Sequence, residues 1–414
     1  MDLEKNAKAY LGEIKSEVTD FLFNLVGIRS YPHDELAACE YCYQKFSEIK
    51  GAKVEKIMID NSLKDHPWHC PGWVGKMDYT DHYNIEITWP GSGEQKPFYM
   101  NAHIDTVFAF SESLFPPYIK DDILYGLGAC DDKGSIASMY TVFRLLSEFE
   151  VKLPFDVVGH VVVEEEIGGN GALAITNRPL EGQCAVDMEP TAGCVMPSSR
   201  AAMVLDIKVR TDSRMMGENV SYKDSAFRLA HLAVKAAQAE HDKYTDNSLN
   251  VWPFEGYRTP SVMGMIEAHG DPDMVSSYAH AWLCITCLNN ISTGEILGRM
   301  ISAIMEVPEL KNKVDLEVLF ERENTIGDPE HPFVQEFSRC VQANGLSGEI
   351  TPMRACSDTI FYQDVIGVPT VVFGPGRLSD AHNIAEQVPL EEVLTCGKTI
   401  FDWIIGRIGK GGPV

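Results

Sequence analysis

Three consecutive carboxylates, Glu164, Glu165 and Glu166, follow a valine-rich run that begins at Val157. A short apolar run bounded by a turn signal is typical of a buried strand of a parallel sheet. Three adjacent acids do not serve packing, because like charges repel unless a positive group lies beside them. Ligands in open α/β sheets bind outside the carboxyl ends of the strands. The stretch therefore predicts the rim of a metal-containing active site; a solvated acidic turn is the alternative.

Four further segments place acids or histidines where a predicted strand ends or a helix begins. Their polar residues are His103 and Asp105, Asp131, Asp187 and Glu189, and His382. A histidine that binds a metal through one ring nitrogen is often oriented by a carboxylate at the other, which suits His103 and Asp105. Carboxylate oxygens and imidazole nitrogens are ligands for zinc, cobalt or manganese. Two histidines and one acid from each of three positions (Asp131, Glu165 or Glu166, and Asp187 or Glu189) exceed one tetrahedral zinc site and predict two ions bridged by a carboxylate.

Composition and charge narrow the class of protein. A formal charge of −25 argues against nucleic-acid and anionic membrane partners, which require basic patches. No segment has the roughly 18 apolar residues of a membrane span, and the N-terminal stretch lacks the apolar core of a secretory signal. Eleven cysteines in such a chain are typical of reduced thiols and predict a cytoplasmic protein.

The chain has 414 residues. Single hydrophobic cores usually stop growing at about 250–300 residues, so two domains are expected. Residues 197–322 contain an Ala-rich helical run and strand-like segments without acids at their ends. We expect a discontinuous α/β catalytic domain at 1–196 and 323–414, with a largely parallel sheet flanked by helices. Residues 197–322 would form an inserted, smaller α/β domain that serves as a lid and for dimerisation.

Five sequence elements, in order, resemble the M20 metallopeptidase family of zinc-dependent aminoacylases, deacetylases, desuccinylases, carboxypeptidases and dipeptidases. The elements are His103-Ile104-Asp105, Gly126 to Gly134, Glu165-Glu166-Ile167-Gly168, Glu189-Pro190-Thr191, and Gly374 to Glu386. The resemblance implies a zinc-peptidase-like catalytic domain with an inserted lid. It also implies two divalent metal ions, zinc in the first place, with cobalt or manganese as alternatives.

The resemblance implies a role for each matched residue. The implied metal ligands, with Asp131 as the bridge, are His103, Asp131, Glu166, Glu189 and His382. The Glu-Pro-Thr match favours Glu189 over Asp187 as a ligand. Asp105 would orient His103, and Glu165 would be the general base that moves a proton from the attacking water to the leaving amine. A cis peptide bond is expected between Asp131 and Asp132.

Two features leave the substrate open. The family's lid domain normally supplies a histidine, but the corresponding stretch around Met215 has none. The candidates to replace it are His231, His269 and His280. Arg354 could bind a substrate carboxylate through paired hydrogen bonds, and a structural ion pair with Asp358 is the alternative.

We therefore expect a metal-dependent amide hydrolase of the deacylase or aminoacylase type. Its substrates would be N-acyl amino acids or short peptides, and it would form a homodimer through the inserted domain. A dipeptidase or carboxypeptidase of the same family is one alternative. A relative that binds metal or ligand without catalysis is the other.

Overall fold

The largest sheet of the computed structural model has six strands in the order β1-β2-β6-β3-β7-β14. The structure describes residues 3–109, 111, 114–212, 214–215, 221–244, 253–255, 261–269, 274–286 and 291–408. The strands are β1 (Lys53–Met58), β2 (Tyr83–Trp89), β6 (Val157–Val162), β3 (Phe98–His103), β7 (Cys184–Asp187) and β14 (Thr370–Val372). Only β2 runs against the others, since β6, β3, β7 and β14 pair in parallel. The predicted largely parallel sheet is confirmed.

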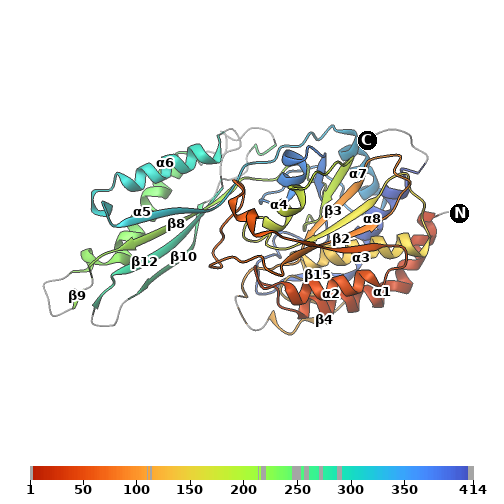
Figure 1. Cartoon of the computed structure of the whole chain (residues 1–414), viewed down its shortest axis with the longest axis horizontal. Coiled ribbons are helices and arrows are strands. Elements are labelled where there is room, and N and C mark those ends of the chain that lie inside the picture. The colour runs from red at the N-terminus through yellow and green to blue at the C-terminus, as the bar shows by residue number, and fades with distance from the viewer. Residues whose placement is uncertain are drawn as a thin grey trace.

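Helices pack around this sheet (Figure 1). They are α1 (Leu3–Gly27), α2 (Leu36–Ser47), α3 (Lys133–Glu148), α4 (Asn170–Thr176), α7 (Pro332–Ala343) and α8 (Leu390–Ile405). Helix α2 contacts β1 and β2, α3 contacts β3, and α1 and α8 pack on α3. Every residue of β3 and β6 is buried, as expected of parallel strands covered on both faces.

A second sheet has four antiparallel strands in the order β10-β12-β8-β13 and forms a separate lobe in Figure 1. The strands are β8 (Ala202–Arg210), β10 (Ser261–His269), β12 (Tyr278–Ile285) and β13 (Val314–Arg322), and α5 (Ala226–His241) and α6 (Thr293–Met305) accompany them. Alternate residues of β12 are buried and join α5 and α6 in a hydrophobic core distinct from that of the larger sheet. Two cores are what an inserted domain requires; the boundaries at 197 and 322 stay a prediction.

A third, small sheet connects two distant parts of the sequence. Its order is β15-β5-β4, with β4 (Tyr118–Lys120), β5 (Ile123–Tyr125) and β15 (Gln387–Pro389). Strand β5 precedes Asp131, and β15 follows His382. Next to this pairing, the backbone N–H of Gly126 donates to the carbonyl of Glu386 at 3.1 Å. The small sheet therefore holds the segments of Asp131 and His382 together.

No helix among the described residues is long and apolar enough to cross a membrane. The ten cysteines that the structure describes are all free thiols. Burial raises the pKa of Cys39, Cys184 and Cys396 well above the ordinary thiol value. These three side chains therefore act as protonated, small hydrophobic groups of the core.

One ionisable pair crosses the central sheet, between Glu86 of β2 and His160 of β6, which lie opposite each other. The Nε2 atom of His160 lies 3.3 Å from Glu86 Oε2, and Arg178 donates to the same oxygen. These hydrogen bonds, that of His160 first, lower the pKa of Glu86 to about 2. His160 is thus a core histidine whose two ring nitrogens both have partners, since Nδ1 lies 2.7 Å from the hydroxyl of Tyr362.

The lowered pKa of Glu86 predicts a defined loss of stability in acid. The unfolded chain binds the proton first as the pH falls, so the free energy of unfolding should decrease from about pH 4.5 toward about pH 2. The variant Glu86→Gln should lack this part of the decrease. Denaturant unfolding of both metal-free proteins across this window measures the difference. Parallel pH profiles for the two proteins would contradict the prediction.

Candidate metal centre

The parallel strands bring the predicted ligands to one edge of the central sheet. His103 is the last residue of β3, Glu165 and Glu166 follow β6, and Glu189 follows β7. Because β3, β6 and β7 run parallel, their carboxyl ends meet at the same edge. Asp131 reaches this edge from the turn before α3.

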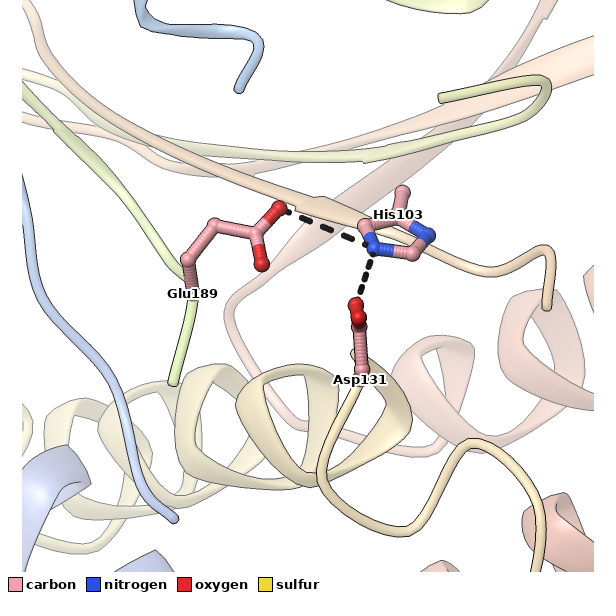
Figure 2. Close-up of side chains that lie close together, drawn as sticks. All are labelled: His103, Asp131 and Glu189. Atoms are coloured by element: carbon pink, nitrogen blue, oxygen red, sulfur yellow. Dashed lines mark hydrogen bonds and ion pairs between the residues drawn. The ribbon is translucent and has the colours of Figure 1, made fainter. Parts of the chain in front are cut away.

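His103, Asp131 and Glu189 form the first group of converging ligand atoms, which all lie within 4.8 Å of one another. His103 Nε2 lies 2.9 Å from Asp131 Oδ1 and 3.7 Å from Glu189 Oε1. Figure 2 shows this ring nitrogen joined by dashed lines to both carboxylates. All three side chains are buried. A nitrogen and two oxygens that converge in this way are a suitable donor set for a divalent ion.

Asp131, Glu166 and His382 form the second group. His382 Nε2 lies 3.3 Å from Asp131 Oδ2 and 3.1 Å from Glu166 Oε2. Asp131 therefore turns one oxygen toward each histidine and is the residue that both groups share. The peptide bond between Asp131 and Asp132 is cis, as the family resemblance implies.

Asp105 belongs to neither ligand group but contacts a residue of each, His103 and Glu166. Its backbone carbonyl and Oδ1 lie 3.1 and 3.3 Å from His103 Nδ1. Since both neighbours are acceptors, Nδ1 carries a hydrogen, and Nε2, which faces the ligand carboxylates, would be the nitrogen that binds a metal. The Asp105 carboxylate also accepts the backbone N–H groups of Glu165 at 3.1 Å and Glu166 at 3.0 Å. It therefore positions the acidic turn as well as the histidine.

The electrostatics of the centre favour bound cations. Burial raises the pKa values of Glu165 and Glu189 well above that of an ordinary carboxyl group, and neighbouring acids add to the shift. The charge of Glu166 raises the pKa of His382 to about 12. Two histidines face an excess of carboxylates, so two divalent ions would supply the missing positive charge. The residues present therefore fit a pair of such ions.

Exposure shows from which side the centre is reached. The side chain of His103 is only 2% exposed and those of Glu189 and Glu166 are 7% exposed. The side chain of His382 is 48% exposed. The centre therefore opens beside His382.

Glu386 supports the centre but was given no role in the sequence analysis. Its Oε1 atom accepts the backbone N–H groups of Cys130 and Asp131, each at 3.0 Å. The signal was present, because Glu386 closes the last matched element of the family pattern. Its oxygen fixes the turn that presents Asp131.

Removing this acceptor should weaken both the fold and the metal site. Glu386→Ala leaves two buried N–H groups unpaired, which is expected to lower the free energy of unfolding by about 1–3 kcal/mol for each. Glu386→Gln keeps an acceptor oxygen and should stay close to the wild type. Denaturant unfolding and zinc affinity measure both effects. Equal losses in the two variants would show that the acceptor is unimportant.

Two acids singled out from the sequence lie outside the ligand groups. Glu164 is fully buried and points away, accepting hydrogen bonds from Tyr79, Asn170 and His33. Asp187 is 3.0 Å from Asn101 and 2.8 Å from Thr359. Glu164 therefore does not belong to the metal-binding rim, and Glu189 rather than Asp187 lies beside His103.

Two basic residues close in sequence to site residues, Lys133 and Arg354, belong to neither ligand group. The buried Lys133 donates to the carbonyl groups of Leu25 and Ile28 and thus caps the end of α1. Arg354 is exposed, whereas Asp358 is buried and lies 3.2 Å from Asn101. The assignment of Arg354 to a substrate carboxylate stays a prediction.

Which residue replaces the family's lid histidine also stays a prediction. His280 on β12 contacts Asp206 and Glu267, and His269 on β10 lies 3.4 Å from Glu267. His231 is exposed on α5. Within the described part of the chain, none of the three has a hydrogen bond or ion pair with the ligand groups. Met215 is exposed in the ribbon of β9 (Arg214–Met215) and β11 (Met274–Val275).

The chain belongs to peptidase family M20/M25/M40, whose profile matches residues 99–405. It is 22% identical, over 81% of its length and 82% of the other, to an N-formyl-4-amino-5-aminomethyl-2-methylpyrimidine deformylase of Bacillus subtilis. It is 23% identical, over 93% and 94%, to a [LysW]-lysine/[LysW]-ornithine hydrolase of Saccharolobus islandicus. Among solved structures, the di-peptidase Dug1p of Saccharomyces cerevisiae is similar, with a TM-score of 0.77, 12% identity and 98% coverage of each chain. The predicted family and fold class are confirmed.

Proposed function

We propose that this chain is an amide hydrolase that uses two divalent ions, zinc in the first place, with cobalt or manganese as alternatives. The proposal is carried by one observation: Asp131 belongs to both ligand groups and turns one oxygen toward each histidine. That arrangement is the one expected of a carboxylate that bridges two ions. Membership of a family of metal-dependent hydrolases supports it.

Each residue of the centre has a distinct task in this reaction. His103 and Glu189 would hold one ion, His382 and Glu166 the other, and Asp131 both. When bound, the ions would activate a water and polarise the scissile carbonyl. Glu165 belongs to neither ligand group, so its carboxylate can take the proton from the attacking water and deliver it to the leaving amine. Asp105 keeps His103 and the backbone of Glu165 in place.

The proposed substrates are N-acyl amino acids or short peptides. The relatives named as a deformylase and as a hydrolase of LysW-linked lysine support removal of an acyl group from an amine. The likeness to a di-peptidase in fold keeps the dipeptidase or carboxypeptidase alternative. Arg354 would bind a free substrate carboxylate. A non-catalytic relative would be expected to lack the base or a ligand, yet Glu165 and all five ligands are present.

We also propose a homodimer through the inserted lobe and a cytoplasmic location. The dimer follows from the resemblance to the family. The cysteine content, which is typical of reduced thiols, supports the location.

The test is amine release from a panel of N-acyl amino acids and dipeptides by zinc- or cobalt-loaded protein. Hydrolysis that stops after chelation and returns with metal is expected, and the best substrate identifies the subclass. Preference for acyl amino acids supports a deacylase, and preference for dipeptides supports the alternative. No hydrolysis of any member by fully loaded protein would contradict the proposal.

A further inference from the structure

The turn that carries Glu165 and Glu166 is contacted from the lobe of the four-stranded sheet, called the lid lobe below; the lobe of the six-stranded sheet is called the catalytic lobe. Its hydrogen bonds run from Gly168 N–H to the carbonyl of Glu165 at 2.9 Å and from Gly169 N–H to that of Glu164 at 2.8 Å. Gly168 has a φ of +128°, and an added Cβ would lie 2.5 Å from Cys70 and 3.2 Å from Phe320 of β13. The turn is therefore packed tightly against a loop of the catalytic lobe and a strand of the lid lobe.

Arg322, the last residue of β13, makes the polar part of this contact. Its Nη2 atom donates to the carbonyl groups of Gly168 and, at 2.7 Å, of Trp68. Nη1 donates to the carbonyl of Glu321 at 2.8 Å. One guanidinium thus joins the lid strand, the loop around Trp68 and the acidic turn. A planar group with several donors suits this task, whereas a single ammonium does not.

The surroundings of Arg322 restrict its position. The residue is only 5% exposed. The centre of the guanidinium lies 5.1 Å from the ring centroid of Phe361 and 5.7 Å from that of Phe320. These rings hold the charged group over the turn. Among the described residues, the hydrogen-bond partners of its two Nη atoms are the backbone carbonyl groups of Glu321, Trp68 and Gly168.

We propose that Arg322 is a positioning residue that holds Glu165 and Glu166 in their working arrangement from the lid side. The part that concerns turnover rests on the proposed function. Asp105 fixes the backbone N–H groups at the start of the turn, and Arg322 fixes the carbonyl at its end. Displacement of the turn by a fraction of an ångström would misplace both the general base and a metal ligand.

A cavity makes this role separable from folding. A space of about 680 Å³ lies beside Arg322 and is also lined by Trp68 and Phe320. Water can enter such a polar space and hydrate the carbonyl groups that a shorter or uncharged side chain leaves unpaired. A variant should therefore fold but lose the fixed position of the turn.

The test compares Arg322→Met, which keeps an unbranched stem without donors, with Arg322→Lys, which restores the charge and a single donor nitrogen. Arg407→Met is the matched control, because Arg407 is also 5% exposed. Arg407 lies just beyond the end of α8 and donates a hydrogen bond to Glu336 of α7, which is not part of the metal centre. Zinc affinities of both sites, kcat, KM and the thermal midpoint are measured for all variants.

For Arg322→Met we expect the affinity of one ion to fall about 10- to 100-fold while the other changes little. We expect kcat to fall about 10- to 100-fold with KM nearly unchanged, and Arg322→Lys to recover part of both losses. Arg407→Met should lower the thermal midpoint only. Wild-type metal affinity in Arg322→Met, or equal loss at both sites with a rise in KM, would overturn the proposal. If the wild type hydrolyses no substrate, the proposed function fails, and the metal affinities still decide the role of Arg322.

Discussion

The variant Glu165→Gln is expected to lower kcat for amide hydrolysis by about 10²- to 10⁴-fold, the usual contribution of a general base. Glutamine has the same shape but cannot accept the proton at this position. The backbone N–H of residue 165 still donates to Asp105, so the turn keeps its support. Because Glu165 is outside both ligand groups, the variant should bind the same number of ions as the wild type. Metal analysis and steady-state kinetics on the best panel substrate measure both properties.

Glu166→Gln provides the comparison for this experiment. Glu166 lies beside His382 in the second ligand group. The glutamine side chain at this position should therefore lower the affinity for one ion as well as the turnover rate. The two neighbouring acids are thereby distinguished by metal content. If Glu165→Gln lost an ion, or kept wild-type turnover, the assignment of the general base would be wrong.

The variant Asp131→Asn is expected to have the broadest effect on the centre. Its two oxygens lie 2.9 Å from His103 Nε2 and 3.3 Å from His382 Nε2. Asparagine keeps one oxygen and loses the charge, so the affinity of both ions should fall, and turnover should drop to the level of the metal-free protein. The affinities are measured by competition with a chelator.

His382→Ala serves as the control for the bridge, because His382 belongs to the second group alone. This variant should lower the affinity for one ion and leave the affinity for the other near its wild-type value. A loss confined to one ion in Asp131→Asn as well would mean that Asp131 does not bridge.

The fold follows from the sequence where the apolar pattern is strong. The valine run after Phe155 is β6, and β3 and β7, which come next in the order of the sheet, are strands as predicted. The apolar spacing predicts a helix over residues 33–50, but helix α2 is shorter and runs from Leu36 to Ser47. His33 has a φ of +69°, outside helical geometry, and its ring hydrogen bonds to Glu164 and to the N–H of Asp78. Such distant partners are invisible to a local pattern.

The residues of the candidate site also differ in whether a local sequence pattern reveals them. Residues of the family pattern could be named in advance, because their types and order are visible in the chain. The three adjacent acids could not be told apart by composition, since Glu164 is turned into the core by a φ of +59°. Arg322 gives no signal at all, because it acts on backbone carbonyl groups far away in the sequence.

In the proposed mechanism, two divalent ions at one shared carboxylate carry out amide hydrolysis. The most direct test titrates metal-free protein with zinc and follows bound metal and amine release in the same samples. We predict two ions per chain, with hydrolysis that appears as they bind and is absent from Asp131→Asn at the same zinc concentration. Saturation at one ion, or hydrolysis that is unchanged in the metal-free protein, would contradict the account.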